Sequence, residues 1–272
     1  MTNLKNQNQF RDSTSAYPYA IIFSMLLTDK QLERYTRQIV LPELGEDGQA
    51  KLFLAKVLVV GAGGLSSAAL MYLASSGVGE IGVVDYDTVD LTNLHRQIIY
   101  DTDDLNKSKV FSVKEKINKI NPDVKVNIFE KKLNKNNIEK IFENYEIIVD
   151  GLDTFSDKFL LNDYSILLNK KLVHAGVIGF EGQVLTVIPK QSACLRCYFP
   201  ETPPDFRQSC RELGVFATCV GVISTIQANE VLKLILGIGK PLTNRILKFN
   251  ALDETFYELK IQGKNESCLI CS

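Results

Sequence analysis

The sequence predicts an α/β protein with a Rossmann-like, doubly wound mixed sheet and antiparallel strands near the C-terminus. Two observations support this fold class. The chain has 272 residues and is 45% apolar, which is enough to bury a substantial core. From residue 57 to residue 174, apolar runs of strand length alternate with helical patterns, as in parallel sheets covered by helices.

The alternation begins after a predicted helix over residues 28–40. Thr28 or Asp29 can cap this helix, and its apolar residues recur at helical spacing. The elements expected next are a buried strand at 57–60 that breaks on glycines, a helix rich in Ala and Ser at 65–75, and an apolar strand at 81–85 that ends on an acid.

The same alternation continues beyond a helix over residues 107–120. This helix stops before Pro122, because proline ends helices. From Gly182 on, the pattern becomes typical of antiparallel strands. The remaining elements are strands at 124–130, 146–150 and 171–174, helices at 136–142, 155–168 and 220–236, and antiparallel strands at 182–189, 245–250 and 255–261.

Charge and composition narrow the class of protein. The 31 basic and 32 acidic residues nearly cancel, so the composition predicts neither a nucleic-acid-binding protein nor a membrane-surface protein. The apolar residues 16–27 are too few to span a bilayer. We expect a cytoplasmic protein with a single domain over residues 28–272. Residues 1–27 are expected to be a leader that is disordered or reflects a start misassigned ahead of Met25.

The glycines after the first strand predict a nucleotide site. In dinucleotide-binding folds the first glycine permits a tight turn, the second lets a phosphate approach the backbone, and an acid about 20 residues later binds the ribose. Gly61, Gly63, Gly64 and Asp85 fit this pattern, whereas Ser66 stands where a third glycine is usual. We favour a nucleotide site over a turn that binds nothing, and the glycines leave the kind of nucleotide open.

Polar residues beyond the second strand favour phosphate chemistry over hydride transfer. Fixed cations stabilise the charge that accumulates on phosphate oxygens during nucleotidyl transfer, and a dehydrogenase needs none beside the ribose. A carboxylate just beyond a buried strand can also hold Mg²⁺ between such oxygens. Each residue alone would be a solvated loop charge, so their combination carries the prediction: Asp85, Asp87, Asp90, Asn93, Arg96, Lys109 and Asp153.

Four of the six cysteines form two C-x-x-C pairs, which predict a metal centre. Four thiolates are the ligand set of a closed, structural zinc site. Disulfides or free thiols are the alternative, and we prefer zinc for a chain without a convincing secretion signal. The pairs are Cys194 with Cys197 and Cys268 with Cys271.

Three further side chains receive structural or minor roles. Cys219 lies in an apolar run and is expected to be a buried small hydrophobe. His95 and His174 are the two histidines of the chain, which does not favour a histidine-centred active site. We expect His174, at the end of a predicted strand, to be structural.

Several segments of the sequence occur in one characteristic order: RYTRQIVLPELGEDGQAKL, VLVVGAGGL, VVDYDTVDLTNLHRQ, NKSKV, VDGLD, GFEGQV and the two C-x-x-C pairs. In these segments the chain resembles the ThiF/MoeB/HesA adenylyltransferases, the bacterial relatives of ubiquitin-activating enzymes. The resemblance covers residues 28–272. It implies an ATP- and Mg²⁺-dependent adenylyltransferase, a nucleotidyltransferase with a structural Zn²⁺ ion.

The resemblance also implies partners. The substrate would be a ubiquitin-like sulfur carrier protein of the ThiS or MoaD type, ending in Gly-Gly. Its activated carboxylate would become a thiocarboxylate for thiamine or molybdopterin biosynthesis. The sulfur would come from a separate donor, a cysteine desulfurase or a rhodanese-like protein. The carrier, the pathway and the donor stay open.

The matched motifs imply the residues that contact ATP. Asp85 would bind the ribose and Lys109 a phosphate, while Asp153 would lie at the magnesium ion. Thr154 stands where the family usually has Asn. The full set is Gly61, Gly63, Gly64, Asp85, Thr92, Asn93, Arg96, Lys109, Asp153 and Thr154.

Two residues imply steps beyond ATP binding. Arg37 matches an arginine that family homodimers insert into the partner's active site, so the resemblance implies a homodimer. Cys210, flanked by Arg207 and Arg211, matches a cysteine that can link to the carrier through sulfur. Nearby cations raise the thiolate fraction of a cysteine.

Three alternatives remain open. Within the same chemistry, the substrate could be a short peptide, as in peptide-antibiotic maturation. In other classes, the protein could be an NAD-dependent dehydrogenase, or a non-catalytic nucleotide-binding module. The intact set of polar residues argues against the last.

Overall fold

The computed structural model describes residues 27–201 and 214–272. The chain groups into two compact units, Met1–Lys51 and Leu52–Ser272. Apart from Leu27, the predicted leader lies outside the described residues. The leader and the single domain over residues 28–272 therefore stay predictions.

The first unit contains helix α2 (Asp29–Ile39) and most of α3 (Gly45–Leu54). Thr28 caps α2 as the sequence predicts. Its Oγ1 accepts a hydrogen bond from Gln31 N at 3.3 Å, and Thr28 N donates to Gln31 Oε1 at 2.9 Å. This reciprocal pair satisfies N–H groups that a helix start leaves without partners. Arg37 is exposed on the last turn of α2.

Within the described residues, the second unit is built on an eight-stranded sheet of order β3-β2-β1-β4-β5-β6-β7-β8. The strands from β3 to β5 pair in parallel, and those from β5 to β8 pair antiparallel. The predicted mixed sheet is therefore confirmed. The strands are β1 (Lys56–Val60), β2 (Glu80–Asp85), β3 (Lys125–Glu130), β4 (Ile147–Asp150), β5 (Lys171–Ile178), β6 (Glu181–Val187), β7 (Arg245–Asn250) and β8 (Thr255–Lys260).

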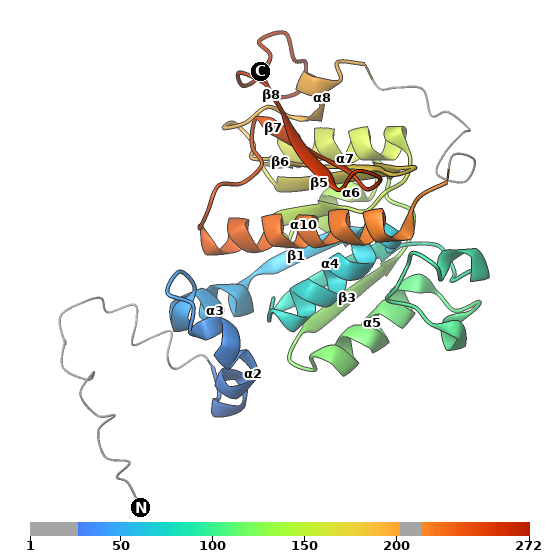
Figure 1. The fold of residues 1–272 in the computed structure, drawn as a ribbon, viewed down its shortest axis with the longest axis vertical. Coiled ribbons are helices and arrows are strands. Elements are labelled where there is room, and N and C mark those ends of the chain that lie inside the picture. The colour runs from blue at the N-terminus through green and yellow to red at the C-terminus, as the bar shows by residue number, and fades with distance from the viewer. Residues whose placement is uncertain (1–26, 202–213) are drawn as a thin grey trace, which may run out of the picture. The chain divides into compact units, whose positions relative to one another are not determined.

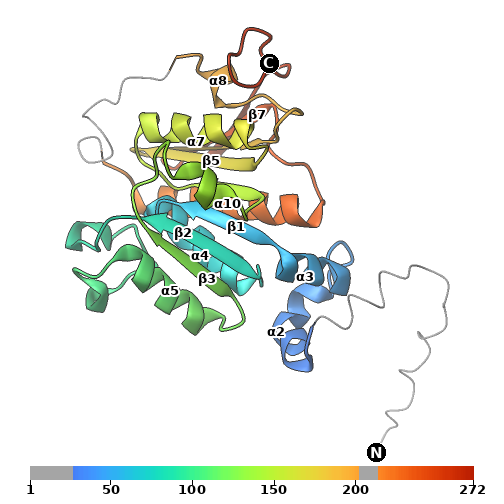
Figure 2. The ribbon, with the colours of Figure 1, turned by 180° about the vertical axis from the view of Figure 1, so that it is seen from behind.

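Helices cover both faces of this sheet. One face carries α4 (Gly64–Ser75), α5 (Lys109–Ile120) and α10 (Ala217–Leu236) (Figure 1). The other carries α6 (Ile138–Phe142) and α7 (Phe155–Leu167) (Figure 2). The strand order reverses between β1 and β4, so the carboxyl ends of these strands flank the crevice where doubly wound sheets bind ligands.

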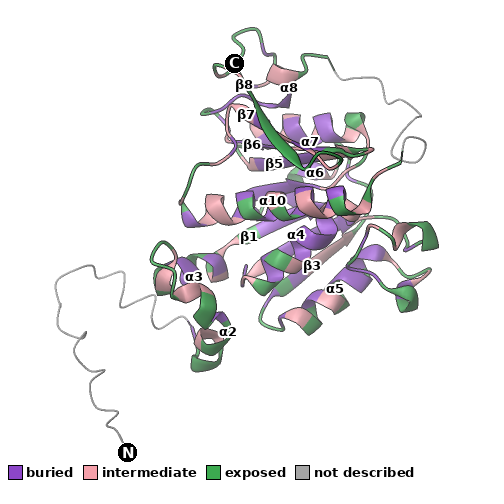
Figure 3. Ribbon diagram, in the orientation of Figure 1, coloured by how far each residue is buried: buried purple, intermediate pink, exposed green. Residues whose placement is uncertain are grey.

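The central strands form the core of the second unit (Figure 3). Every residue of β4 is buried, and in β1 only Lys56 is exposed. On the α7 face the core includes Phe142 and Phe159 and continues to Cys194 and Cys268. The cysteine cluster thus belongs to the same core as α7.

Helix α10 is the element, among the described residues, that is long and apolar enough to cross a membrane. In this fold 56% of its apolar window is buried. Ser224 accepts a hydrogen bond from Ala69 N of α4 at 2.9 Å, and Gln227 donates to carbonyls of β4 and β5. These contacts are those of a core helix.

The elements differ from the sequence prediction mainly at their ends. β5 runs beyond His174 to Ile178, because its last residues pair with the start of β6. The sequence pattern also missed α3, the short helix α8 (Leu195–Tyr198) and two 3₁₀ turns, η1 (Leu91–Asn93) and η2 (Thr102–Asp104).

Candidate nucleotide site and metal centre

The glycine turn after β1 lies against the loop after β4. Gly61 has a φ of 87°, in the region that favours glycine. A Cβ added to Gly61 would lie 2.7 Å from Gly151 O. The turn therefore needs glycine for its conformation, as predicted, and also for the close approach of the two strand ends.

Ser66 fits the position where a third glycine is usual. It is fully buried in α4, and its hydroxyl donates a hydrogen bond to Gly61 O. A Cβ added to Gly151 would lie 1.9 Å from Ser66 Oγ. The serine hydroxyl therefore packs into space that glycine leaves at position 151, and the helix stays close to the sheet.

Asp85 ends β2 with its carboxylate on the glycine turn. Its Oδ2 accepts a hydrogen bond from Ala62 N at 2.6 Å, and its Oδ1 accepts one from Asp87 N at 2.8 Å. Each carboxylate oxygen can accept two hydrogen bonds, so acceptor sites remain. The carboxylate is held in place where a ribose hydroxyl would be recognised.

Arg96 lies against the start of α4. A Cβ added to Gly64 would lie 3.2 Å from Arg96 O and 3.6 Å from its Cγ. One guanidinium nitrogen donates to Thr92 O at 2.6 Å. Thr92 and Asn93 belong to η1, where Asp90 accepts a hydrogen bond from Thr92 N and its own N–H donates to the Asn93 side chain. The loop of residues 92–96, which includes three of the residues predicted to contact ATP, is thus ordered by its own polar groups.

Two residues of this loop were missed from the sequence. The Tyr100 hydroxyl donates to Ala62 O at 2.7 Å, and burial and the Asp85 carboxylate raise the pKa of this tyrosine, so it stays a donor. Gln97 is buried beside the turn, with its Nε2 3.8 Å from a Cβ placed on Gly63. Tyr100 follows an apolar pair, which from sequence alone indicates core.

Lys109 begins α5 and is nearly buried. Its side chain is 7% exposed, and its Nζ lies 3.1 Å from Asp87 Oδ2, whereas Asp87 is 48% exposed. The buried end of the pair is the cation, and the carboxylate faces solvent. The structure thus brings Lys109 to the acidic loop after β2, as predicted.

The loop after β4 carries Asp153, which is exposed. Thr154 is the N-cap of α7: its Oγ1 accepts a hydrogen bond from Asp157 N at 3.3 Å. Asp153 is therefore an exposed carboxylate three residues beyond the end of a central strand and one residue before the N-cap of α7.

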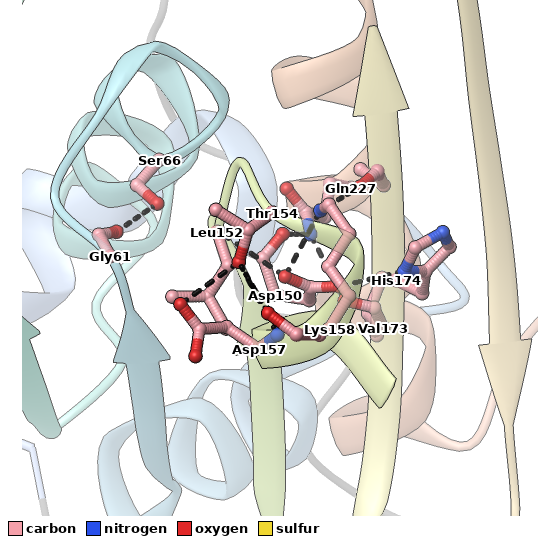
Figure 4. Close-up of polar contacts among 12 residues, drawn as sticks. Gly61, Ser66, Asp150, Leu152, Thr154, Asp157, Lys158, Val173, His174 and Gln227 are labelled. Carbon is pink, nitrogen blue, oxygen red and sulfur yellow. Dashed lines mark hydrogen bonds and ion pairs between the residues drawn. The ribbon is translucent and has the colours of Figure 1, made fainter. Parts of the chain in front are cut away.

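Beneath this loop, Asp150 forms a buried ionic cluster with Lys158 and His174 (Figure 4). Asp150 Oδ1 lies 3.2 Å from Lys158 Nζ, and Oδ2 lies 2.6 Å from His174 Nδ1. Oδ1 also accepts a hydrogen bond from Leu152 N at 3.0 Å. Sequence reasoning missed the roles of Asp150 and Lys158, and expected His174 to be structural.

The pKa values in this cluster follow from burial and charge. Burial alone would raise the pKa of Asp150, but Lys158 and the hydrogen bond from His174 outweigh it, so this pKa lies below its usual value. Burial lowers the pKa of His174 more strongly than Asp150 raises it. The directions of these two shifts keep Asp150 ionised and His174 neutral at neutral pH.

The four cysteines of the two C-x-x-C pairs meet at one point. Their Sγ atoms all lie within 4.8 Å of one another, with 3.7 Å between Cys194 and Cys268 and 3.3 Å between Cys197 and Cys271. Tetrahedral zinc with Zn–S bonds of about 2.3 Å brings sulfur atoms to about 3.8 Å. Asn265 N also donates to Cys197 Sγ at 3.4 Å. The residues fit a closed tetrahedral metal site.

Helix α8, which contains Cys197 and has Cys194 as its N-cap residue, is fixed to α7. Arg196 donates to both carboxylate oxygens of Asp163, at 2.8 and 2.7 Å, and its guanidinium lies 5.0 Å from the centre of the Phe159 ring. Leu195 N donates to Asn162 Oδ1 at 2.9 Å. The cysteine cluster is thereby held against the same helix that supplies Lys158.

Three other residues were singled out in the sequence. Arg37 belongs to the first unit, and Cys210 lies outside the described residues. Cys219 is buried in α10, as predicted, and burial raises the pKa of its thiol to about 11.

The chain is an α/β protein of the doubly wound class. It has a glycine turn at the switch between β1 and β4, an acid that ends β2, and a cluster of four cysteines that could hold a metal ion. The ThiF family model matches residues 35–270. The chain belongs to the ThiF family.

Curated relatives cover nearly the whole chain. A sulfur carrier protein adenylyltransferase from Thermus thermophilus is 40% identical over 253 residues, which are 91% of this chain and 93% of that protein. A SAMP-activating enzyme E1 from Haloferax volcanii is 39% identical over 91% of this chain and 92% of that protein. An adenylyltransferase and sulfurtransferase MOCS3 from Culex quinquefasciatus is 41% identical over 90% of this chain, but the match spans 56% of that protein.

Solved structures share the fold at lower identity. E. coli MccB with AMPCPP and MccA has a TM-score of 0.79 and 23% identity, covering 91% of this chain and 75% of that chain. PaaA has a TM-score of 0.74 and 24% identity, covering 92% of this chain and 77% of that chain. At these identities the similarity shows the fold alone.

Proposed function

We propose that this protein uses ATP to adenylylate the C-terminal glycine of a ubiquitin-like sulfur carrier protein. The observation that carries the proposal is the match to the Thermus thermophilus sulfur carrier protein adenylyltransferase, which spans nearly the full length of both chains. The ordered loop of Arg96 against the glycine turn supports it, because nucleotidyl transfer needs cations beside the phosphates.

The reaction requires positioning more than proton transfer. A carboxylate oxygen of the carrier attacks the α-phosphorus of ATP, the bond from that phosphorus to the bridging oxygen breaks, and pyrophosphate leaves with the electron pair. The carboxylate is already ionised at neutral pH, so no general base is needed. The product is an acyl adenylate.

The residues of the site divide this work. Asp85 holds the ribose, and the turn of Gly61, Gly63 and Gly64 brings backbone close to the nucleotide. Asn93 and Arg96, with the Thr92 segment, bind the triphosphate. Lys109 balances phosphate charge; its pairing with Asp87 holds it in place until ATP binds.

Two metal ions complete the proposal. Asp153, with Thr154 beside it, would hold Mg²⁺, which neutralises phosphate charge when bound. Zn²⁺ would occupy the four cysteines and contribute to folding, because a site with four protein ligands leaves no open position for catalysis.

ATP–pyrophosphate exchange tests the function. With Mg²⁺ and a carrier ending in Gly-Gly, we expect exchange with one of the ThiS- or MoaD-type carriers, and this would identify the thiamine or molybdopterin branch. The same carrier lacking its last glycine is the control. No exchange with any carrier would overturn the proposal. Exchange with a short peptide alone would favour a peptide substrate. Turnover that depends on NADH would favour a dehydrogenase.

We also propose a homodimer in which Arg37 completes the partner's site. Subunit complementation tests this role. Arg37→Ala and Asp153→Ala should each abolish exchange, and a mixture of the two should recover about a quarter of wild-type activity, because half of the random dimers contain one intact site. If the mixture stays inactive although the subunits exchange, Arg37 does not act in the partner.

Cys210 is proposed for the later sulfur step only. Cys210→Ala should spare exchange and block thiocarboxylate formation, with sulfur supplied by a cysteine desulfurase or a rhodanese-like protein. We expect this chemistry in the cytoplasm, where thiols stay reduced.

A further inference from the structure

The loop that carries Asp153 is fixed on both sides of this residue. On one side, Leu152 N donates to the buried Asp150 carboxylate at 3.0 Å. On the other, Thr154 caps α7, and its carbonyl accepts the first helical hydrogen bond from Lys158 N at 3.1 Å. Asp153 lies between two anchored neighbours, so its exposed carboxylate is presented from a backbone with little freedom.

The anchor beneath this loop is itself held from three elements. Lys158 of α7 donates to Asp150 Oδ1 and to Ala175 O of β5, at 3.2 and 2.7 Å. Gln227 of α10 donates to Asp150 O at 2.9 Å and to Val173 O at 3.0 Å. Figure 4 shows these side chains converging on Asp150 at the end of β4. The carboxylate and the carbonyl of Asp150 are thus both occupied.

His174 contributes a single hydrogen bond to this anchor. Its Nδ1 lies 2.6 Å from Asp150 Oδ2, and its Nε2 is buried with no hydrogen-bond partner among the described residues. An ionised Asp150 can only accept, so the imidazole carries its proton on Nδ1 and leaves a lone pair on Nε2. The ring thus serves the Asp150 carboxylate without adding charge.

We propose that Asp150, held by Lys158 and His174, is the positioning residue for the Asp153 carboxylate. This inference rests on the proposed function, in which Asp153 holds Mg²⁺. Groups that hydrogen-bond a metal ligand change metal affinity about 10–100-fold when they are removed. Asp150 acts one step further away, through the N–H of Leu152, so we expect an effect at the lower end of this range. Asp150 is fully buried, whereas Asp153 is exposed, so the effect of Asp150 should appear as a change in the Mg²⁺ requirement.

The test is a double-mutant cycle read out in the Mg²⁺ dependence of exchange. His174→Phe removes the hydrogen bond to Asp150 and keeps a ring of similar size. We expect it to raise the Mg²⁺ concentration for half-maximal exchange about 10-fold. His174→Asn places an amide N–H near the position of Nδ1 and should restore most of the wild-type Mg²⁺ requirement. Asp150→Asn should act in the same direction as His174→Phe.

The cycle is closed in an Asp153→Glu background, in which the magnesium carboxylate is displaced by one methylene. If Asp150 acts through Asp153, His174→Phe should then cause little further change, because coupled residues are not additive. An equal fold-change in both backgrounds would overturn the inference, and so would an unchanged Mg²⁺ requirement in His174→Phe.

A binding measurement separates this inference from the proposed function. Mn²⁺ binding in the presence of a non-hydrolysable ATP analogue, followed by electron paramagnetic resonance, needs no carrier and no turnover. We expect weaker Mn²⁺ binding in His174→Phe than in wild type and recovery in His174→Asn. If wild type showed no exchange with any carrier, the function would fail; equal Mn²⁺ affinity in wild type and His174→Phe would overturn the positioning role in either case.

Discussion

Two buried clusters on the α7 face of the sheet balance charge by different means. In the first, the Asp150 carboxylate meets the Lys158 ammonium of the same chain. The second consists of four cysteine sulfur atoms. As thiolates they all carry negative charge, so a bound metal cation is needed to balance them. A protein cation is present whenever the chain is folded, whereas a metal ion depends on supply. Substitution should affect both clusters, but only the cysteine cluster should respond to metal removal, and the Asp150 cluster should respond to pH through His174.

Breaking the cysteine cluster is expected to have the largest effect. Cys268→Ser removes one of four donors, and structural zinc contributes directly to folding free energy. We expect the melting temperature to fall by about 10 °C or more and zinc content to drop below about half an equivalent. Cys219→Ala, at a buried thiol outside the cluster, should keep its zinc. Unchanged melting after complete zinc removal would contradict a structural metal.

Breaking the Asp150 cluster should cost less and should not involve zinc. Lys158→Met leaves the Asp150 carboxylate buried without its cation, which costs about 3–5 kcal/mol in unfolding free energy. Lys158→Arg keeps the charge and should cost less. Urea unfolding measures both variants, and zinc content should match wild type. If Lys158→Met and wild type had the same urea midpoint of unfolding, the ion pair between Lys158 and Asp150 would not stabilise the fold.

The pH dependence of stability should report the Asp150 cluster. The pKa of His174 is lowered by burial and by Lys158 and Lys248, and raised by Asp150. Its stabilising contribution is present above about pH 6.5 and is lost as pH falls below that value, because the unfolded chain binds the proton first. Asp150, whose pKa is lowered, adds a further loss of stability below about pH 4, as its carboxylate takes up a proton.

Melting temperature measured from pH 7.5 down to pH 5 tests this titration. The titration of His174 should lower the unfolding free energy by up to about 1.4 kcal/mol per pH unit, and the melting temperature should fall with it. The decline should be shallower in His174→Phe, which cannot titrate. Parallel curves for the two proteins would mean that another group is responsible.

The smallest effect is expected at the contact that joins α8 to α7. Arg196→Lys loses the two-pronged hydrogen bond to Asp163 and should cost about 1 kcal/mol or less, because the pair is partly exposed. It should also speed zinc loss to a chelator. Arg245→Lys, at a similarly exposed pair with Glu258, is the matched control and should not change zinc loss. Equal rates of zinc loss in the two variants would show that the contact between α8 and α7 does not stabilise the metal site.

The parts of the fold that follow from local pattern were predicted well. The glycine turn, the strand that ends on Asp85 and the two C-x-x-C pairs each depend on short-range spacing, so the sequence sufficed for them. The end of β5 was placed too early at His174, since its last residues are strand because β6 returns beside them. Such pairing is a tertiary effect that no local pattern records.

The buried cluster could not be predicted for the same reason. Lys158 has the pattern of a solvated helix charge, and Asp150 that of the end of a strand. Only the strand order, which places β4 beside β5 and under α7, brings them together with His174. Their pairing needs the fold to be known first. The exposed carboxylate of Asp153 was predicted from its motif, but its fixed neighbours were not.

One turn of α7 separates Lys158 from Asn162 and Asp163, which hold helix α8 beside the cysteine cluster. If binding at the nucleotide site and at the cysteine cluster is coupled through this helix, the coupling is reciprocal. A nucleotide that strengthens zinc binding at the other end of α7 would itself be bound more tightly, by the same factor, when zinc occupies the cysteines. The affinity of the protein for ATP would then depend on whether zinc occupies the cysteine cluster.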